Sequence, residues 1–219
     1  DGACRISGLV QRVKELGQKA VAITDHGVMY GAVDFYNECI ENGIKPIIGC
    51  EVYVAPRSRF DKESRLDMSP YHLVLLCENN VGYHNLVKIV SDAYIKGFYN
   101  RPRCDMETLG KYHEGIIALS ACLAGEIPRA MLGQGYQAAK EAALRYRQIF
   151  GENNFFIEVQ DHGIAEQKRL IPLLYRLSED TGIPLIATND AHYLTKNDAD
   201  MQNVLTCIAT NSTINESKL

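Results

Sequence analysis

Short apolar runs alternate with stretches of helical periodicity along this chain, and the alternation restricts the folds that it can adopt. The runs cover residues 20–24, 47–54, 72–77, 115–120, 155–160 and 184–188. Helical periodicity covers residues 9–16, 29–42, 81–96, 136–150, 165–181 and 198–208. Strands that alternate with helices predict a largely parallel α/β fold. We expect a barrel rather than an open sheet, because no glycine-rich phosphate loop is present and polar residues follow most of the runs.

Side chains that can bind metal ions stand at the ends of these apolar runs or inside them. They are Asp25, His26, Glu51, His72, Cys122, Asp190 and His192. Because the carboxyl ends of parallel strands meet at one rim, ligands that are far apart in sequence can converge there. The pattern therefore predicts a metal centre assembled from several strand ends.

Most of these residues have an ordinary explanation when they are taken one at a time. Asp25 is also typical of a helix N-cap, His72 of a hydrogen-bonded core imidazole, and Cys122 of a small core side chain. Glu51 is the strongest single signal, because a carboxylate inside a buried apolar strand is costly unless a cation or another partner meets it. The hypothesis rests on Asp-His and Asp-Ala-His at two strand ends, with Glu51 between them in sequence.

The donor types indicate the metal and the chemistry. Histidine, carboxylate and thiolate together suit Zn²⁺, with Mn²⁺ or Fe²⁺ as alternatives where carboxylates dominate. Two or three such ions roughly 3.5 to 4 Å apart hold and polarise a phosphate ester and generate hydroxide from bound water. The expected reaction is phosphoester hydrolysis.

Composition narrows the class of protein. The formal net charge of −4 argues against a domain that holds nucleic acid by bulk electrostatics. The 7 cysteines show no CxxC spacing, which favours reduced thiols and a cytoplasmic location. No apolar run reaches the roughly 20 residues of a membrane span. The first residues lack an initiator Met and the last nine have no character of a natural end, so we expect a segment of a longer protein.

Five sequence phrases carry a family resemblance. They are AITDHG at residues 22–27, GCEVY at 49–53, HLVLL at 72–76, LSACLAGEIP at 119–128 and NDAHY at 189–193. They resemble the polymerase and histidinol phosphatase (PHP) domain. The phrases GFYNRPR at 97–103 and FIEVQDHG at 156–163 are similar to the form of that domain at the N-terminus of bacterial DNA polymerase III alpha subunits. The likeness covers nearly the whole chain, so we expect residues 1–219 to form a single PHP domain.

The resemblance implies a distorted seven-stranded (β/α) barrel with up to three metal ions on its rim. Carried over by position, the metal ligands are Asp1, His26, Glu51, His72, Cys122, Asp190 and His192. The family's opening strand carries a His-x-His pair before the position of Asp1, so we expect this chain to lack that first strand and two ligands of the first metal.

The resemblance also assigns each ligand to an ion. Glu51 would bridge two metals and would form the catalytic pair with Asp190, which sits on the first metal. His72 and Cys122 would bind the second metal. The third metal would be held by Asp1, His26 and His192. Asp25 has no metal in this scheme, and it would orient His26 or cap the next helix.

Three functions are compatible with these residues. In the first, the domain belongs to a DNA-directed DNA polymerase for DNA replication and retains metal-dependent 3′ to 5′ exonuclease chemistry, impaired in this fragment. In the second, it is a structural module that docks the proofreading subunit. In the third, which the polymerase-type phrases disfavour, it is a free phosphatase. The resemblance implies DNA, the proofreading subunit and the sliding clamp as partners, no membrane, and nucleotidyl transfer in a later domain.

Overall fold

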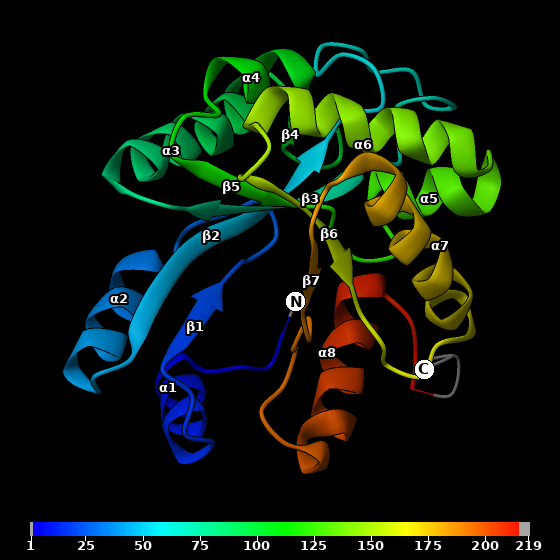
Figure 1. Cartoon of the computed structure of the whole chain (residues 1–219). Coiled ribbons are helices and arrows are strands. Elements are labelled where there is room, and N and C mark those ends of the chain that lie inside the picture. The colour runs from blue at the N-terminus through cyan, green and yellow to red at the C-terminus, as the bar shows by residue number, and fades with distance from the viewer. Residues whose placement is uncertain (1, 215–219) are drawn as a thin grey trace. The chain divides into compact units, whose positions relative to one another are not determined.

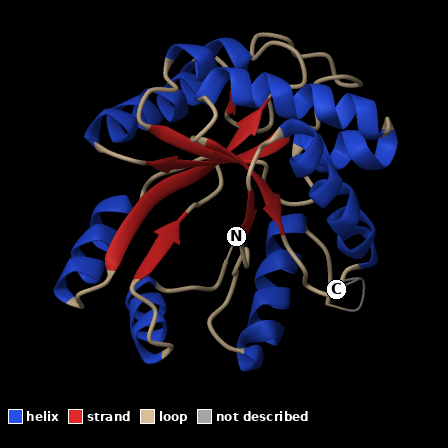
Figure 2. Cartoon of the chain, viewed as in Figure 1, coloured by secondary structure: helices blue, strands red, loops and turns tan. Residues whose placement is uncertain are grey.

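The computed structural model describes residues 2–214. The helices are α1 (Ile6–Glu15), α2 (Ala32–Glu41), α3 (Asn80–Ile95), α4 (Met106–Lys111), α5 (Glu126–Gly133), α6 (Tyr136–Phe150), α7 (Ala165–Thr181), the 3₁₀ helix η1 (Lys196–Asp198) and α8 (Ala199–Thr210). The strands are β1 (Ala20–Ile23), β2 (Lys45–Val54), β3 (Tyr71–Cys77), β4 (Arg103–Cys104), β5 (Ile116–Leu119), β6 (Phe155–Val159) and β7 (Leu185–Ala187). Figure 2 shows these elements by type. No helix within residues 2–214 is long and apolar enough to cross a membrane.

The chain divides into two compact units. One unit contains Asp1–Ile23, Tyr30–Ile47 and Asp190–Leu219, and its described part holds α1, α2, η1 and α8 with β1 and the start of β2. In that unit the backbone N–H of Lys45 donates to the carbonyl of Lys19 at 2.8 Å. The second unit contains Thr24–Met29 and Ile48–Asn189.

The second unit is a sheet covered by helices. Its strands run in the order β2, β3, β5, β6 and β7, and β4 pairs with the end of β2. Helices α3, α5 and α6 pack on this sheet, and α7 packs on β6 (Figure 1). The α/β class predicted from the sequence is confirmed.

The prediction of a largely parallel sheet is wrong for β3. This strand is antiparallel to both of its neighbours, β2 and β5, whereas the pairs β5–β6 and β6–β7 are parallel. A parallel pair needs a crossover connection, usually a helix, and residues 55–70 between β2 and β3 contain none. The chain therefore returns beside β2 in the opposite direction.

The predicted count of six strands is also too low. The additional strand is β4, which has 2 residues and pairs in parallel with Tyr53 and Val54 of β2. Two further elements, α4 and α5, lie where we predicted no helix. All three are too short to show a period of their own in the sequence.

Alternation along the strands separates a face that packs into the main core from a second face that does not. Leu73 and Leu75 of β3 enter the main core, while Val74 between them belongs to a small cluster with Leu119 and Ala121. Burying each leucine side chain contributes about 1.5 to 3 kcal/mol, which fixes the orientation of the strand. The residues next to these leucines, at positions 72 and 74, consequently face away from the main core.

Candidate metal centre

Strand register brings Glu51, Tyr53 and His72 to the same face of the sheet. Cys50, Val52 and Val54 of β2 point into the main core, so the residues between them point the other way. In the antiparallel pair, Glu51 lies opposite Val74 and Tyr53 lies opposite His72. Glu51 and His72 are therefore diagonal neighbours on the face that the main core does not occupy.

Backbone hydrogen bonds fix His26 next to Glu51. The N–H of Gly27 donates to the carbonyl of Glu51 at 2.9 Å, and the N–H of Glu51 donates to the carbonyl of Asp25 at 3.0 Å. Gly27 has φ +66°, and a Cβ there would lie 2.9 Å from Cγ of Pro102. A glycine is therefore required directly after His26.

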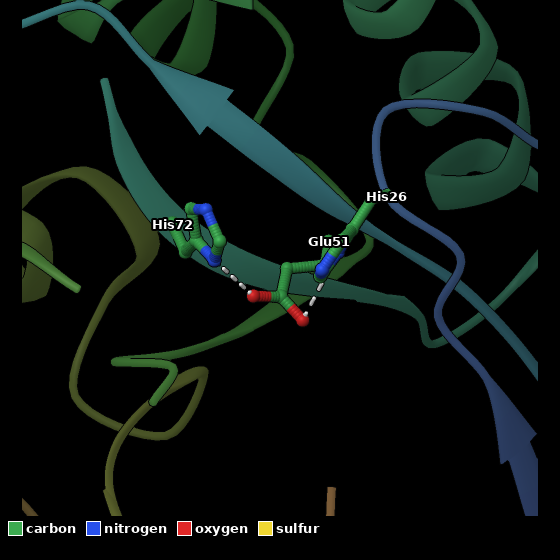
Figure 3. Close-up of side chains that lie close together, drawn as sticks. All are labelled: His26, Glu51 and His72. Carbon is green, nitrogen blue, oxygen red and sulfur yellow. Dashed lines mark ion pairs between the residues drawn. The ribbon is translucent and has the colours of Figure 1, made fainter. Parts of the chain in front are cut away.

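The two imidazoles approach opposite oxygens of the Glu51 carboxylate (Figure 3). His72 Nδ1 lies 2.6 Å from Oε1, and His26 Nδ1 lies 3.5 Å from Oε2. One ligand atom from each of the three residues falls within 4.8 Å of the others. Glu51 is 5% exposed, whereas both histidine side chains are partly open to solvent. This arrangement places a buried carboxyl group between two imidazole nitrogens.

Cys122 extends the group with a sulfur atom. Its Sγ lies 3.8 Å from His72 Nδ1 and 4.0 Å from Glu51 Oε1. The turn after β5 that carries it contains Ala121 at φ +62°. The N–H of His72 donates to the carbonyl of Ala124 at 3.1 Å, which ties this turn to β3.

Gly125 lets the turn close. A Cβ at this position would lie 2.2 Å from the carbonyl oxygen of Ser120. The N–H of Gly125 donates to the carbonyl of Cys122 at 2.9 Å. The position of the thiol therefore depends on a glycine three residues further along the chain.

Tyr53 forms an aromatic wall that sequence reasoning missed. Its ring meets the His72 ring edge to face at 5.3 Å between centroids, and the His26 ring lies 6.0 Å away. Burial is the main cause that raises the pKa of the Tyr53 phenol above its usual value. The available signal was its spacing of two residues from Glu51, which places both side chains on one face of a strand.

Glu158 of β6 is a second buried carboxylate that we did not single out. Its Oε1 accepts hydrogen bonds from Gln160 Nε2 at 3.1 Å and from the hydroxyl of Thr188, and its N–H donates to Ser120 Oγ. Glu158 and Cys122 both line one surface depression. The place of Glu158 inside an apolar strand was the same signal that identified Glu51.

The donors present fit a divalent metal. Ligand nitrogen and oxygen atoms lie roughly 2.0 to 2.2 Å from zinc, so two of them on one ion are separated by at most about 4 Å. The His26, Glu51 and His72 atoms need only small side-chain rotations to satisfy this limit, since they lie within 4.8 Å. The thiol of Cys122 adds the soft donor that favours zinc.

The remaining three predicted ligands are Asp1, Asp190 and His192. Asp190 and His192 belong to the first unit, where Asp190 has φ +47° and its carbonyl lies 2.9 Å from His192 Nδ1. Asp1 lies outside the described residues. The participation of all three therefore stays a prediction.

Asp25 supports the metal-binding group through its backbone carbonyl. Its carbonyl accepts from the N–H of Glu51 and from the Cys50 thiol. Burial is the main cause that raises the pKa of that thiol to about 12, which keeps it protonated. The next helix, α2, is capped at Gly31, so the expectation that Asp25 caps it is wrong.

Comparison with known proteins identifies the family. The family model described as "PHP domain" matches residues 1–162. The chain is 50% identical over 96% of its length to the DNA polymerase III subunit alpha of Treponema pallidum, and 43% identical over 99% to that of Thermus aquaticus. It spans only 18% of either relative.

Solved structures agree in fold. An amidohydrolase of Chromobacterium violaceum matches with a TM-score of 0.57 at 14% identity, covering 88% of this chain and 84% of that one. A two-domain protein of Bacteroides vulgatus that contains a predicted PHP-like metal-dependent phosphoesterase matches with a TM-score of 0.51 at 13% identity, covering 93% of this chain and 52% of that one. The fold and the family model agree, and the chain belongs to the PHP domain family.

Proposed function

We propose that residues 1–219 form the PHP domain of a bacterial DNA polymerase III alpha subunit and that it supports metal-dependent phosphoester hydrolysis at DNA ends. The observation that carries the chemistry is the buried Glu51 carboxylate with one histidine nitrogen facing each oxygen. The names of the relatives support the polymerase context. The activity would be a 3′ to 5′ exonuclease.

His26, Glu51 and His72 would hold a divalent metal, Zn²⁺ by preference and Mn²⁺ or Fe²⁺ as alternatives, with Cys122 beside them. The bound metal would supply Lewis-acid polarisation of a phosphoryl oxygen and a water of lowered pKa. For this role Glu51 must be ionised and both imidazoles neutral, so metal binding releases protons. Each oxygen of Glu51 faces a different histidine nitrogen, so the carboxylate is positioned to bind metal together with either imidazole.

Asp1, Asp190 and His192 would complete the set of ligands, up to three ions. Asp190 would then be the second catalytic carboxylate beside Glu51. The partners would be DNA, the proofreading subunit and the sliding clamp of the replicative complex in the cytoplasm. Nucleotidyl transfer would belong to later domains of the polymerase.

A scaffold role is the second candidate, and one observation favours it. His72 Nδ1 lies 2.6 Å from Glu51 Oε1, so this carboxylate is satisfied by a protein donor. A polar group of this kind can rigidify a docking module without any metal. The two functions therefore differ in whether the group binds metal at all.

Metal analysis and hydrolysis separate the two functions. The purified chain, its E51Q and H72A variants and the control H84A, which changes an exposed histidine of α3, are loaded with Zn²⁺ or Mn²⁺ and freed of excess metal. The enzymatic function predicts bound metal and weak, chelator-sensitive cleavage of a single-stranded oligonucleotide in the wild type and H84A, with both lost in E51Q and H72A. Equal, negligible metal in all four proteins would leave the scaffold role.

A further inference from the structure

Residues 97–103 form a tightly closed turn beside the metal-binding group. The guanidinium of Arg103, which is fully buried, donates to the carbonyls of Gly97, Arg59, Asp61 and Asp67. A Cβ at Gly97 would lie 1.9 Å from the carbonyl oxygen of Arg103, so the two ends of the turn are in close contact. Such a turn holds its tip in one place.

The tip of the turn presents Arg101. The N–H of Tyr99 donates to the carbonyl of Arg101 at 3.0 Å, and Asn100 between them has φ +60°. Pro102 is buried against Gly27, the residue that follows His26. The backbone at Arg101 is thus fixed to the segment that carries a predicted metal ligand.

Arg101 is an exposed cation held next to the site. Its Cζ lies 5.7 Å from the centroid of the Tyr53 ring, within the range of a cation–π contact. The Tyr53 ring lies 5.3 Å from the His72 ring, so the guanidinium carbon is within about 11 Å of that imidazole. The guanidinium makes no ion pair within residues 2–214, and its N–H donors remain available.

We propose that Arg101 binds the phosphodiester backbone of a single-stranded polynucleotide next to the phosphate held at the His26, Glu51 and His72 group. This inference rests on the proposed function and adds a substrate preference to it. At the axial spacing of about 3.4 Å per phosphate in one strand of a duplex, 11 Å spans about three nucleotides, and it spans fewer in an extended single strand. A phosphate one to three positions along the same strand is therefore within reach. A small phosphomonoester has no second phosphate to meet Arg101.

The chemistry of arginine suits this task. Its planar guanidinium binds phosphate oxygens in a bidentate manner, and its stacking on an aromatic ring preorders it. The chain has a net charge of −4, so affinity for a polyanion must come from such local cations. Arg101 would raise affinity for nucleic acid without taking part in bond cleavage.

The test compares R101A and R101K with the control R176A. Arg176 is also exposed and also stacks on a tyrosine, with its Cζ 4.5 Å from the ring of Tyr136 on α6. Hydrolysis is measured with a fluorescein-labelled 12-nucleotide thymidine oligomer and with bis-p-nitrophenyl phosphate, in Mn²⁺ and over a range of salt concentrations. Binding of the same oligomer in EDTA is followed by fluorescence anisotropy.

We expect R101A to raise KM for the oligomer about tenfold with little change in kcat, and to leave the aryl diester within twofold of wild type. The slope of log(kcat/KM) against log salt should become shallower by about 0.7, the value for one phosphate contact to a single strand. R101K should recover part of the loss. Equal behaviour of R101A and R176A on the oligomer, with aryl diester hydrolysis intact, would overturn the role of Arg101 and leave the proposed function standing.

The EDTA binding assay decides the inference if the wild type hydrolyses neither substrate, the result that refutes the proposed function. A weaker, less salt-dependent affinity of R101A than of R176A would then still support a nucleic-acid contact. Identical affinities of the two variants would overturn it.

Discussion

Removing His72 tests whether the polar group is a metal site built around a buried carboxylate. In the metal-free protein, H72A leaves Glu51 Oε1 with the Cys122 thiol, 4.0 Å away, as its one side-chain partner among residues 2–214. An unsatisfied buried acceptor costs about 1 to 3 kcal/mol, and more when it is charged. We therefore expect a loss of about 2 kcal/mol in the free energy of unfolding, which lowers Tm by about 4 to 8 °C in a chain of this size.

H26A should behave differently in the metal-free protein. His26 Nδ1 lies 3.5 Å from Glu51 Oε2 and its side chain is 23% exposed, so the contact is long and partly solvated. A long, partly solvated contact of this kind contributes about 0 to 1 kcal/mol. The expected order of destabilisation in chelator is thus H72A, then H26A, then the exposed control H84A.

In zinc, H26A should be clearly less stable than the wild type, although the two have similar stability in chelator. A ligand at 100 times its Kd stabilises the folded state by about 2.7 kcal/mol, and loss of either histidine should remove most of that gain. Thermal unfolding followed by circular dichroism, with EDTA and with Zn²⁺, measures the Tm of the wild type, H26A, H72A and H84A under both conditions. The reasoning is refuted if H26A costs as much as H72A in chelator, or if zinc raises the Tm of both variants as it does that of the wild type.

Three further outcomes follow from single contacts. G125A forces a Cβ to within 2.2 Å of the Ser120 carbonyl and should lower zinc affinity, which titration with a competing chelator measures; unchanged affinity would contradict it. Burial is the main cause that raises the pKa of Tyr146, and Glu126 raises it further. The free energy of unfolding should therefore fall as pH rises above about 10, and it should fall less steeply in Y146F. Urea unfolding measures this, and an equal pH dependence in both proteins would contradict it. Iodoacetamide should label Cys122 faster without metal than with it, by mass spectrometry, and equal rates would count against metal ligation there.

Helices whose ends are marked by local sequence signals were predictable from the sequence. The bounds of α6 and α7 coincide with the predicted ranges, because long apolar periodicity ends at glycines with positive φ, Gly151 and Gly182. Strand β4 had no such signal, because it has 2 residues and pairs with Tyr53 and Val54, which lie far from it in sequence. Tertiary contacts of this kind are not encoded in a local period.

The direction of β3 could have been predicted from the sequence, whereas its register against β2 could not. The charged loop at residues 57–65 offered no helix between two strands, and that alone argues for an antiparallel return. What no sequence pattern supplies is register. A slip of one residue between β2 and β3 would turn His72 away from Glu51 and place an apolar side chain there.

The same reasoning explains why Glu51 was found and Arg101 was not. A buried carboxylate can be recognised in the sequence, because its apolar neighbours show that it will be desolvated and desolvation has a large free-energy cost. An exposed arginine has no desolvation cost, so its role can be inferred only from the residues that lie beside it in space. Here that neighbour is Tyr53, whose ring contacts the rings of His26 and His72. It connects Arg101 to the metal-binding group, although Tyr53 and Arg101 lie 48 positions apart in sequence.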